Sequence, residues 1–298
     1  MNMKTSEYLE IFECSQRKEL SPKTVNRKIY EVSKFFEYLD KQGIQSLENF
    51  DIRHVYDYLN SLDYASQTVS CIQFTLREFF DVMYKHDISD VDGRHIFPVI
   101  FTNKRDRILS YYNIDEIRDV ISQIDINQEN GVRDKCMILL AAQTGLRSGD
   151  IIGLTFKEIF WDKNVISKIQ AKTGIRVSVP LPENLKYLLI DYIKNHRPDS
   201  KEDYIFICQE SKTRYSDAEL YSILLKYFKK STVVVGNRKH GPHALRHSLA
   251  ARLLDNNTPM PVITGILGHK NINTTSKYLS IDIEGLRRAS LEVPTDEN

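Results

Sequence analysis

The sequence predicts a mainly α-helical protein with a small β-sheet, organised as two domains. Its 298 residues are more than one hydrophobic core usually needs, so two domains are the natural expectation. Apolar residues recur with a period of about 3.6 in most segments, which favours helices. Two β-branched runs, 165–170 and 175–179, flank the turn Lys172-Thr173-Gly174 and predict a β-hairpin.

The first domain, residues 1–98, is expected to be all α-helical, with four helices joined by short loops. The first helix covers residues 5–20, the third 52–62 and the fourth 66–85. The second begins at Ser21-Pro22, because proline suits a first helical position. Residues 87–94 are rich in turn formers, and residues 99–110 form an extended, basic linker. Opposite the apolar side of the second helix lies a row of cations, either a solvated face or a phosphate-facing stripe: Lys23, Arg27, Lys28 and Lys34.

The second domain, residues 111–290, opens with a capping box formed by Asn113 and Glu116. An apolar helix over 131–143 is closed by Gly145, so Arg147 projects from a rigid helix end, where Asp150 could hold it. Further helices are expected over 182–195 and from 216 to 230, followed by a basic loop over 233–242. The tail, 291–298, is acidic and polar.

Residues 243–278 carry polar side chains at spacings that packing alone does not require. His243 and Arg246 stand three apart, so on a helix they share one face and can reach one ligand. A break at residues 256–259 separates this helix from a short second one that ends at Gly268, which can adopt the turn that presents His269. A third helix, capped at 271 or 273, carries Tyr278. Each motif by itself is typical of ordinary structure: a surface pair for His243 and Arg246, a turn for Gly268-His269, and a core residue for Tyr278. Their combination within 36 residues is what packing does not explain.

Composition is that of an ordinary globular protein, with 41% hydrophobic and 27% charged residues and a net charge of +1. Residues 205–288 hold 13 Lys and Arg against 6 Asp and Glu, whereas residues 1–103 hold 12 against 16. The basic field is therefore concentrated around the candidate site. Four scattered cysteines without a CxxC indicate reduced thiols in a cytoplasmic protein, and no apolar run is long enough to span a membrane.

These motifs together resemble the tyrosine recombinase (phage integrase) family over roughly residues 105–285. The resemblance rests on TGLRSGD at 144–150, QAKTG at 170–174, HALRH at 243–247, ILGH at 266–269 and TTSKY at 274–278. It implies a SAM-like helical core-binding domain that clamps one side of a DNA duplex, followed by a mixed α/β catalytic domain. The start of the helical domain near residue 1 favours a simple Xer-like member without an arm-binding domain.

The resemblance also implies the roles of six residues. Arg147 and Arg246 would bind the phosphate oxygens, since a guanidinium offers a planar fork of donors and stays charged. His269 would hydrogen-bond the same phosphate. His243 would be the base, Lys172 the acid at the 5′ oxygen and Tyr278 the nucleophile.

On this resemblance the protein is a site-specific DNA recombinase that acts through a 3′-phosphotyrosine and a Holliday junction. Its partners would be double-stranded recombination sites and three further copies of itself on DNA, with a monomer or weak oligomer when free and no membrane contact. No cofactor or metal is expected, because the phosphodiester energy is retained. The biological task would be integration or excision of a mobile element, or resolution of DNA multimers.

Three other interpretations stay open at this stage. A type IB topoisomerase would share most of these residues, and a non-catalytic DNA-binding protein could share the fold without needing Tyr278 or Lys172. A structural protein with coincidental motifs is the third. The HxxxH of His243 and His247 suggests a zinc protease, but Ala244 stands where that motif has its glutamate base.

Overall fold

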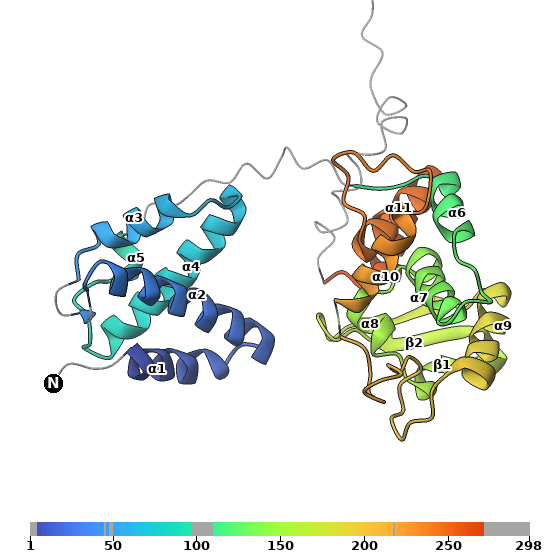
Figure 1. The fold of residues 1–298 in the computed structure, drawn as a ribbon, viewed down its shortest axis with the longest axis horizontal. Coiled ribbons are helices and arrows are strands. Elements are labelled where there is room, and N and C mark those ends of the chain that lie inside the picture. The colour runs from blue at the N-terminus through green and yellow to red at the C-terminus, as the bar shows by residue number, and fades with distance from the viewer. Residues whose placement is uncertain (1–4, 45, 48–49, 97–109, 217, 271–298) are drawn as a thin grey trace, which may run out of the picture. The chain divides into compact units, whose positions relative to one another are not determined.

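The computed structural model describes residues 5–44, 46–47, 50–96, 110–216 and 218–270, and these form two compact units, one within Met1–Asp106 and one within Arg107–Asn298 (Figure 1). The described part is mainly α-helical and contains a small antiparallel sheet, as the sequence predicts. None of the helices in these ranges is both long and apolar enough to cross a membrane. The expected linker and tail lie outside the described residues.

The first unit is a set of helices around an aromatic core. Ser21 caps α2 by accepting a hydrogen bond from the Thr24 amide, and Pro22 occupies the first position of that helix. Phe35, Phe36, Phe79 and Phe80 are buried between α2 and α4, mostly in edge-to-face or tilted pairs. The helices are α1 (Thr5–Arg17), α2 (Pro22–Lys41), α3 (Arg53–Ser61), α4 (Ser66–Lys85) and α5 (Gly93–Ile96).

Three cations of the row on α2, Lys23, Arg27 and Lys34, are at least partly exposed, as the solvated-face interpretation predicts, but Lys28 is buried. Lys28 is only 4% exposed and donates to Gln16 at 2.7 Å and Glu78 at 2.5 Å, so it ties α2 to α1 and α4. Arg27 forms an ion pair with Glu31, and Lys34 forms one with Glu37 at 2.7 Å. Lys28 is therefore a core ion-pair residue, since a buried ammonium needs such partners.

The second unit is built around α7, whose described neighbours include α6, α8, α9, α10 and α11. Most side chains of α7 are buried, Cys136, Met137, Ile138 and Leu140 completely, which explains its continuous apolar sequence. Its helices are α6 (Ile114–Ser122), α7 (Gly131–Thr144), α8 (Ser148–Ile152), α9 (Glu183–Asp191), α10 (Glu219–Phe228), α11 (Pro242–Asp255) and α12 (Met260–Leu267), with short 3₁₀ segments η2 (Phe156–Glu158) and η3 (Trp161–Lys163) and one π turn, η4 (Tyr192–His196).

The sheet has three antiparallel strands in the order β1 (Ile159–Phe160), β2 (Val165–Ile169) and β3 (Arg176–Pro180). In the predicted hairpin, Ile166 pairs with Val179 and Lys168 with Val177. The sequence analysis missed β1, because two residues carry no alternating pattern. Lys168 lies on the buried side of β2, where its ammonium donates to the Gly153 carbonyl at 2.8 Å and to Glu158.

Three element boundaries differ from the sequence prediction. α10 begins at Glu219 and not at 216, although the Ser216 amide donates to the Glu219 carboxylate as in a capping box. The helix expected over 182–195 continues as the π turn η4 after Asp191. The turn-rich segment at 87–94 leads into the single helical turn of α5.

Candidate active site

Arg147 lies between two helices of the second unit. Gly145 ends α7 with φ +65°, a left-handed conformation that glycine adopts without steric cost, and Arg147 is the N-cap residue of α8. The Arg147 guanidinium donates to the Gln170 side-chain oxygen and, at 3.5 Å, to the Gly268 carbonyl. The end of α7 therefore directs Arg147 toward the end of α12. The sequence predicted that Arg147 projects from a helix end, but not that it meets α12.

Arg246 reaches the same place from α11. It is 2% exposed, and its guanidinium donates to the Gly145 carbonyl at 2.6 Å and to the Leu267 carbonyl. Both acceptors lie at helix ends, where carbonyls lack partners within the helix. The guanidinium thus joins the C-terminal turns of α7 and α12 while keeping its positive charge.

The turn after α12 joins these arginines to His269. Gly268 caps the helix with φ +61°, and the His269 amide donates to the Thr264 carbonyl at 3.2 Å. Arg246 donates to the carbonyl of Leu267 and Arg147 to that of Gly268, so His269 follows directly the two peptide groups that hold the arginines. The guanidiniums of Arg147 and Arg246 and the backbone of His269 therefore meet at the end of α12.

Lys172 lies in the β2–β3 turn, and its side chain is exposed. The Gln170 amide donates to the Ile175 carbonyl at 2.9 Å, and the Gly174 amide donates back to the Gln170 carbonyl at 2.8 Å, which closes the turn. Asp150 Oδ1 accepts a hydrogen bond from the Ala171 amide at 3.0 Å. Asp150 therefore fixes the base of the Lys172 turn to α8, a role that the sequence analysis did not foresee.

His243 lies in the first turn of α11, exposed at its surface, with its ring stacked on that of His247 at 6.3 Å between centroids. The protein that packs around the ring lowers the pKa of His243 below its ordinary value of 6.5. The positive charges of Arg246, Lys172 and Arg147 lower it further, so all three lie within electrostatic range of the imidazole. At neutral pH the ring is uncharged and can accept a proton.

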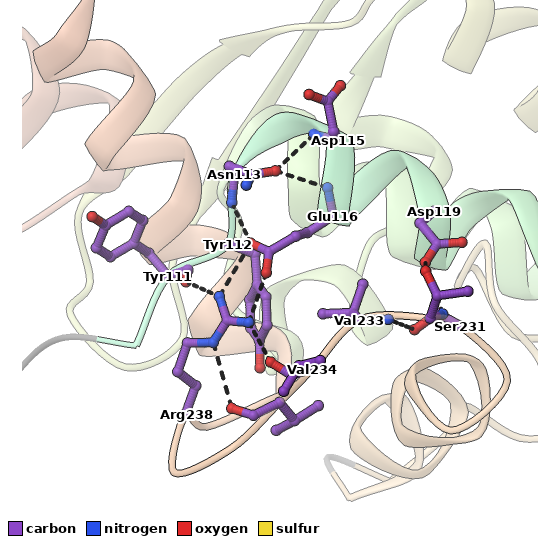
Figure 2. A network of polar contacts seen from close by, with 12 residues as sticks. Tyr111, Tyr112, Asn113, Asp115, Glu116, Asp119, Ser231, Val233, Val234 and Arg238 are labelled. Atoms are coloured by element: carbon purple, nitrogen blue, oxygen red, sulfur yellow. Dashed lines mark hydrogen bonds and ion pairs between the residues drawn. The ribbon is translucent and has the colours of Figure 1, made fainter.

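The loop before α11 is held in place by α6 (Figure 2). Arg238 donates to Glu116 at 2.6 Å and to the Tyr111 and Val234 carbonyls, contacts that Figure 2 marks with dashed lines. Its guanidinium lies 4.2 Å from the centre of the Tyr112 ring. Glu116 also completes the predicted capping box with Asn113. Because this loop leads directly into α11, these contacts fix the start of the helix that carries His243 and Arg246.

Five of the six predicted residues are therefore gathered in one region of the second unit: Arg147, Lys172, His243, Arg246 and His269. Tyr278 and the third helix expected to carry it lie outside the described residues. In the part of the chain that the structure describes, no group of three or more His, Cys, Asp or Glu side chains is arranged to hold a metal ion. All four cysteines are free.

Sequence reasoning missed one residue of this region, Gln170. Its side chain is completely buried, and its amide bonds to Arg147 and to the Leu267 carbonyl. One signal was present in the sequence. Gln170 lies four residues after Ile166, and residues an even number apart in a strand point to the same side of the sheet, which for Ile166 is the core. A polar residue at a core-facing position requires a buried partner.

The chain is similar to known proteins in both sequence and fold. Residues 110–284 match the sequence profile of the phage integrase family. A putative integrase/recombinase of Sinorhizobium fredii, y4gC, is 32% identical over 167 residues, which are 56% of this chain and 86% of that protein. Tyrosine recombinase XerD of Staphylococcus epidermidis is 26% identical over 296 residues, 97% of each chain. A solved lambda integrase tetramer bound to a Holliday junction has a similar fold, with a TM-score of 0.73 and 17% sequence identity. The match covers 93% of this chain and 77% of the lambda integrase chain.

Substitution of Gly268 tests the close packing at the end of α12. A Cβ at this position would lie 2.5 Å from the Gln170 side-chain oxygen and 2.6 Å from Val177, in addition to the strain of φ +61°. Gly236 has φ +53° but no atom within 4 Å of such a Cβ, so Gly236→Ala is the matched control for backbone strain alone. We expect Gly268→Ala to lower the free energy of unfolding by about 1–3 kcal/mol more than Gly236→Ala, the usual range for overpacking. Equal losses in urea denaturation would contradict the described packing.

The charge state of His243 is testable in the free protein. We expect the His243 imidazole to titrate with a midpoint below 6.5, because partial desolvation by the surrounding protein and the neighbouring cations both disfavour its protonated form. Added salt should move the midpoint upward by screening those cations. The measurement is a histidine proton NMR titration, with His243→Gln used for assignment, and a midpoint above 6.5 would be the contrary result.

Proposed function

The chain belongs to the phage integrase family and is a tyrosine-type site-specific recombinase, and we propose that it cuts and rejoins DNA through a covalent 3′-phosphotyrosine intermediate. One observation carries the proposal. Arg147 and Arg246 come from separate motifs, yet they donate to the carbonyls of adjacent residues, immediately before His269. Two fixed cations and an imidazole on one unit suit the charge that develops on a phosphate during displacement.

In the cleavage step, the Tyr278 hydroxyl oxygen attacks the phosphorus of one phosphodiester, and the bond between phosphorus and the 5′ oxygen breaks. The phenol proton passes to His243, whose lowered pKa keeps the imidazole neutral and ready to accept it. Lys172, on its exposed turn, donates a proton to the departing 5′ oxygen. Arg147, Arg246 and His269 stabilise the non-bridging oxygens throughout.

The rejoining step is the reverse reaction with a different strand. A 5′-hydroxyl of the second DNA site attacks the phosphotyrosine, a new phosphodiester forms, and Tyr278 is released. One phosphodiester is exchanged for another, so the proposed chemistry draws no energy from ATP. Exchange of one strand pair leaves a Holliday junction, and exchange of the second resolves it.

We propose further that four copies act together on two DNA sites, and that the helical unit of residues 1–98 and the catalytic domain of residues 111–290 both bind the duplex. The likeness to the lambda integrase tetramer on a Holliday junction supports this assembly, since it extends over 93% of this chain. The free cysteines fit a cytoplasmic enzyme. Integration or excision of a mobile element and resolution of DNA multimers would use the same chemistry, and the DNA sequence that is cleaved distinguishes them.

The decisive prediction concerns Tyr278. Incubated with nicked duplexes from the DNA that flanks the gene, the unmodified protein should give a covalent protein–DNA band on a denaturing gel. Tyr278→Phe should give none, because it lacks the attacking hydroxyl. The matched control is Tyr187→Phe, which alters a tyrosine that is 66% exposed on α9 and should trap DNA as the unmodified protein does.

Three results would contradict the proposal. Retained DNA binding with no covalent band on any duplex would favour a non-catalytic DNA-binding protein. A band that persists in Tyr278→Phe would require another nucleophile. Covalent trapping without sequence preference, together with relaxation of supercoiled plasmid, would favour a type IB topoisomerase activity.

A further inference from the structure

Gln170 occupies the point where the Lys172 hairpin meets both arginines. It directly follows β2 and is completely buried. Its side-chain oxygen accepts hydrogen bonds from the Arg147 guanidinium and, at 3.0 Å, from the Thr173 hydroxyl. Its side-chain nitrogen donates to the Leu267 carbonyl at 3.1 Å.

The Leu267 carbonyl is shared, because Arg246 donates to it as well. A continuous chain of hydrogen bonds therefore runs from Arg147 through the Gln170 amide and the Leu267 carbonyl to Arg246. The same amide fits closely against Gly268, where even a methyl group would lie 2.7 Å from its carbonyl carbon. The Gln170 side chain thus links the position of Arg147 to that of Arg246.

The chemistry of this link favours an amide. Glutamine supplies an acceptor for Arg147 and a donor for the Leu267 carbonyl from one planar group, whereas an ionised glutamate only accepts. A carboxylate would also form a charge-assisted pair with Arg147 and compete with a phosphate for the same donors. A neutral oxygen orients the guanidinium and leaves its charge available.

We propose that Gln170 is a positioning residue for the recombinase reaction: it sets the Arg147 guanidinium against the scissile phosphate and fixes its distance from Arg246. This inference rests on the proposed phosphotyrosine chemistry. Gln170 does not touch the reacting atoms and acts through Arg147. Misplacement of a catalytic group by about 1 Å can cost on the order of 100-fold in rate, so loss of the amide should slow cleavage by about 10- to 100-fold.

The test compares two DNA backbones in single-turnover cleavage of the nicked duplex that the unmodified protein traps. One duplex carries the normal phosphodiester, and the other carries a neutral methylphosphonate at the scissile position, which has less negative charge for the arginines to stabilise. We expect Gln170→Ala to slow cleavage of the phosphodiester and to have little effect on the methylphosphonate, the same pattern as Arg147→Ala. A change that merely loosens the fold would slow both reactions alike.

Two further variants keep the test decisive. Gln170→Glu preserves size should Gln170→Ala unfold, and it should also slow phosphodiester cleavage at neutral pH. Gln123→Ala removes a glutamine amide from the partly exposed end of α6, where it donates to Asp119 at 3.1 Å, and should cleave both substrates at the unmodified rate.

The outcomes separate the two proposals. Phosphodiester cleavage by Gln170→Ala at the unmodified rate, or an equal loss on both backbones in both Gln170 variants, overturns the positioning role and leaves the recombinase chemistry intact. Absence of covalent product from the unmodified protein overturns the chemistry itself and the role of Gln170 with it.

Discussion

The site depends on two carbonyls at the end of α12 that have no partner within that helix. Leu267 and Gly268 close that helix in a left-handed turn, and their carbonyls accept hydrogen bonds from Arg246 and Arg147 respectively. A helix end leaves such acceptors without intrahelical partners, and guanidinium groups are well suited to satisfy them when buried. The same turn sets the position of the His269 backbone, so one local conformation brings the two arginines and His269 together.

Neutral acceptors hold the arginines in this arrangement. The Gly145, Leu267 and Gly268 carbonyls and the Gln170 amide fix the orientation of the two guanidiniums without supplying a negative charge. The positive potential that results is felt by His243, whose pKa it helps to lower. Oriented cations beside a neutral imidazole are what a phosphate-displacement site requires, since its ligands are then in place before the charge develops.

Sequence patterns predicted the parts of this site that depend on local structure. The glycine that ends α7, the shared face of His243 and Arg246 and the turn at Gly268 each follow from helix periodicity and capping chemistry. Contacts between distant segments could not be predicted in the same way. Gln170 meets Leu267 across 97 residues, and Asp150 meets Ala171 across 21, through the docking of a hairpin that no local pattern encodes. Lys28 was misassigned for the same reason, because its partner Glu78 lies 50 residues away.

A crystal structure of the protein with its cleaved DNA site and vanadate, which mimics the pentavalent phosphorus, tests most directly whether the end of α12 organises the site. The result we predict has Arg147, Arg246 and His269 on the equatorial vanadate oxygens and the Tyr278 oxygen at one apex, while Arg246 still donates to the Gly145 and Leu267 carbonyls. A vanadate contacted by only one of the two arginines, or an Arg246 that has left those carbonyls to reach it, would contradict the claim that the end of α12 organises the site before DNA binds.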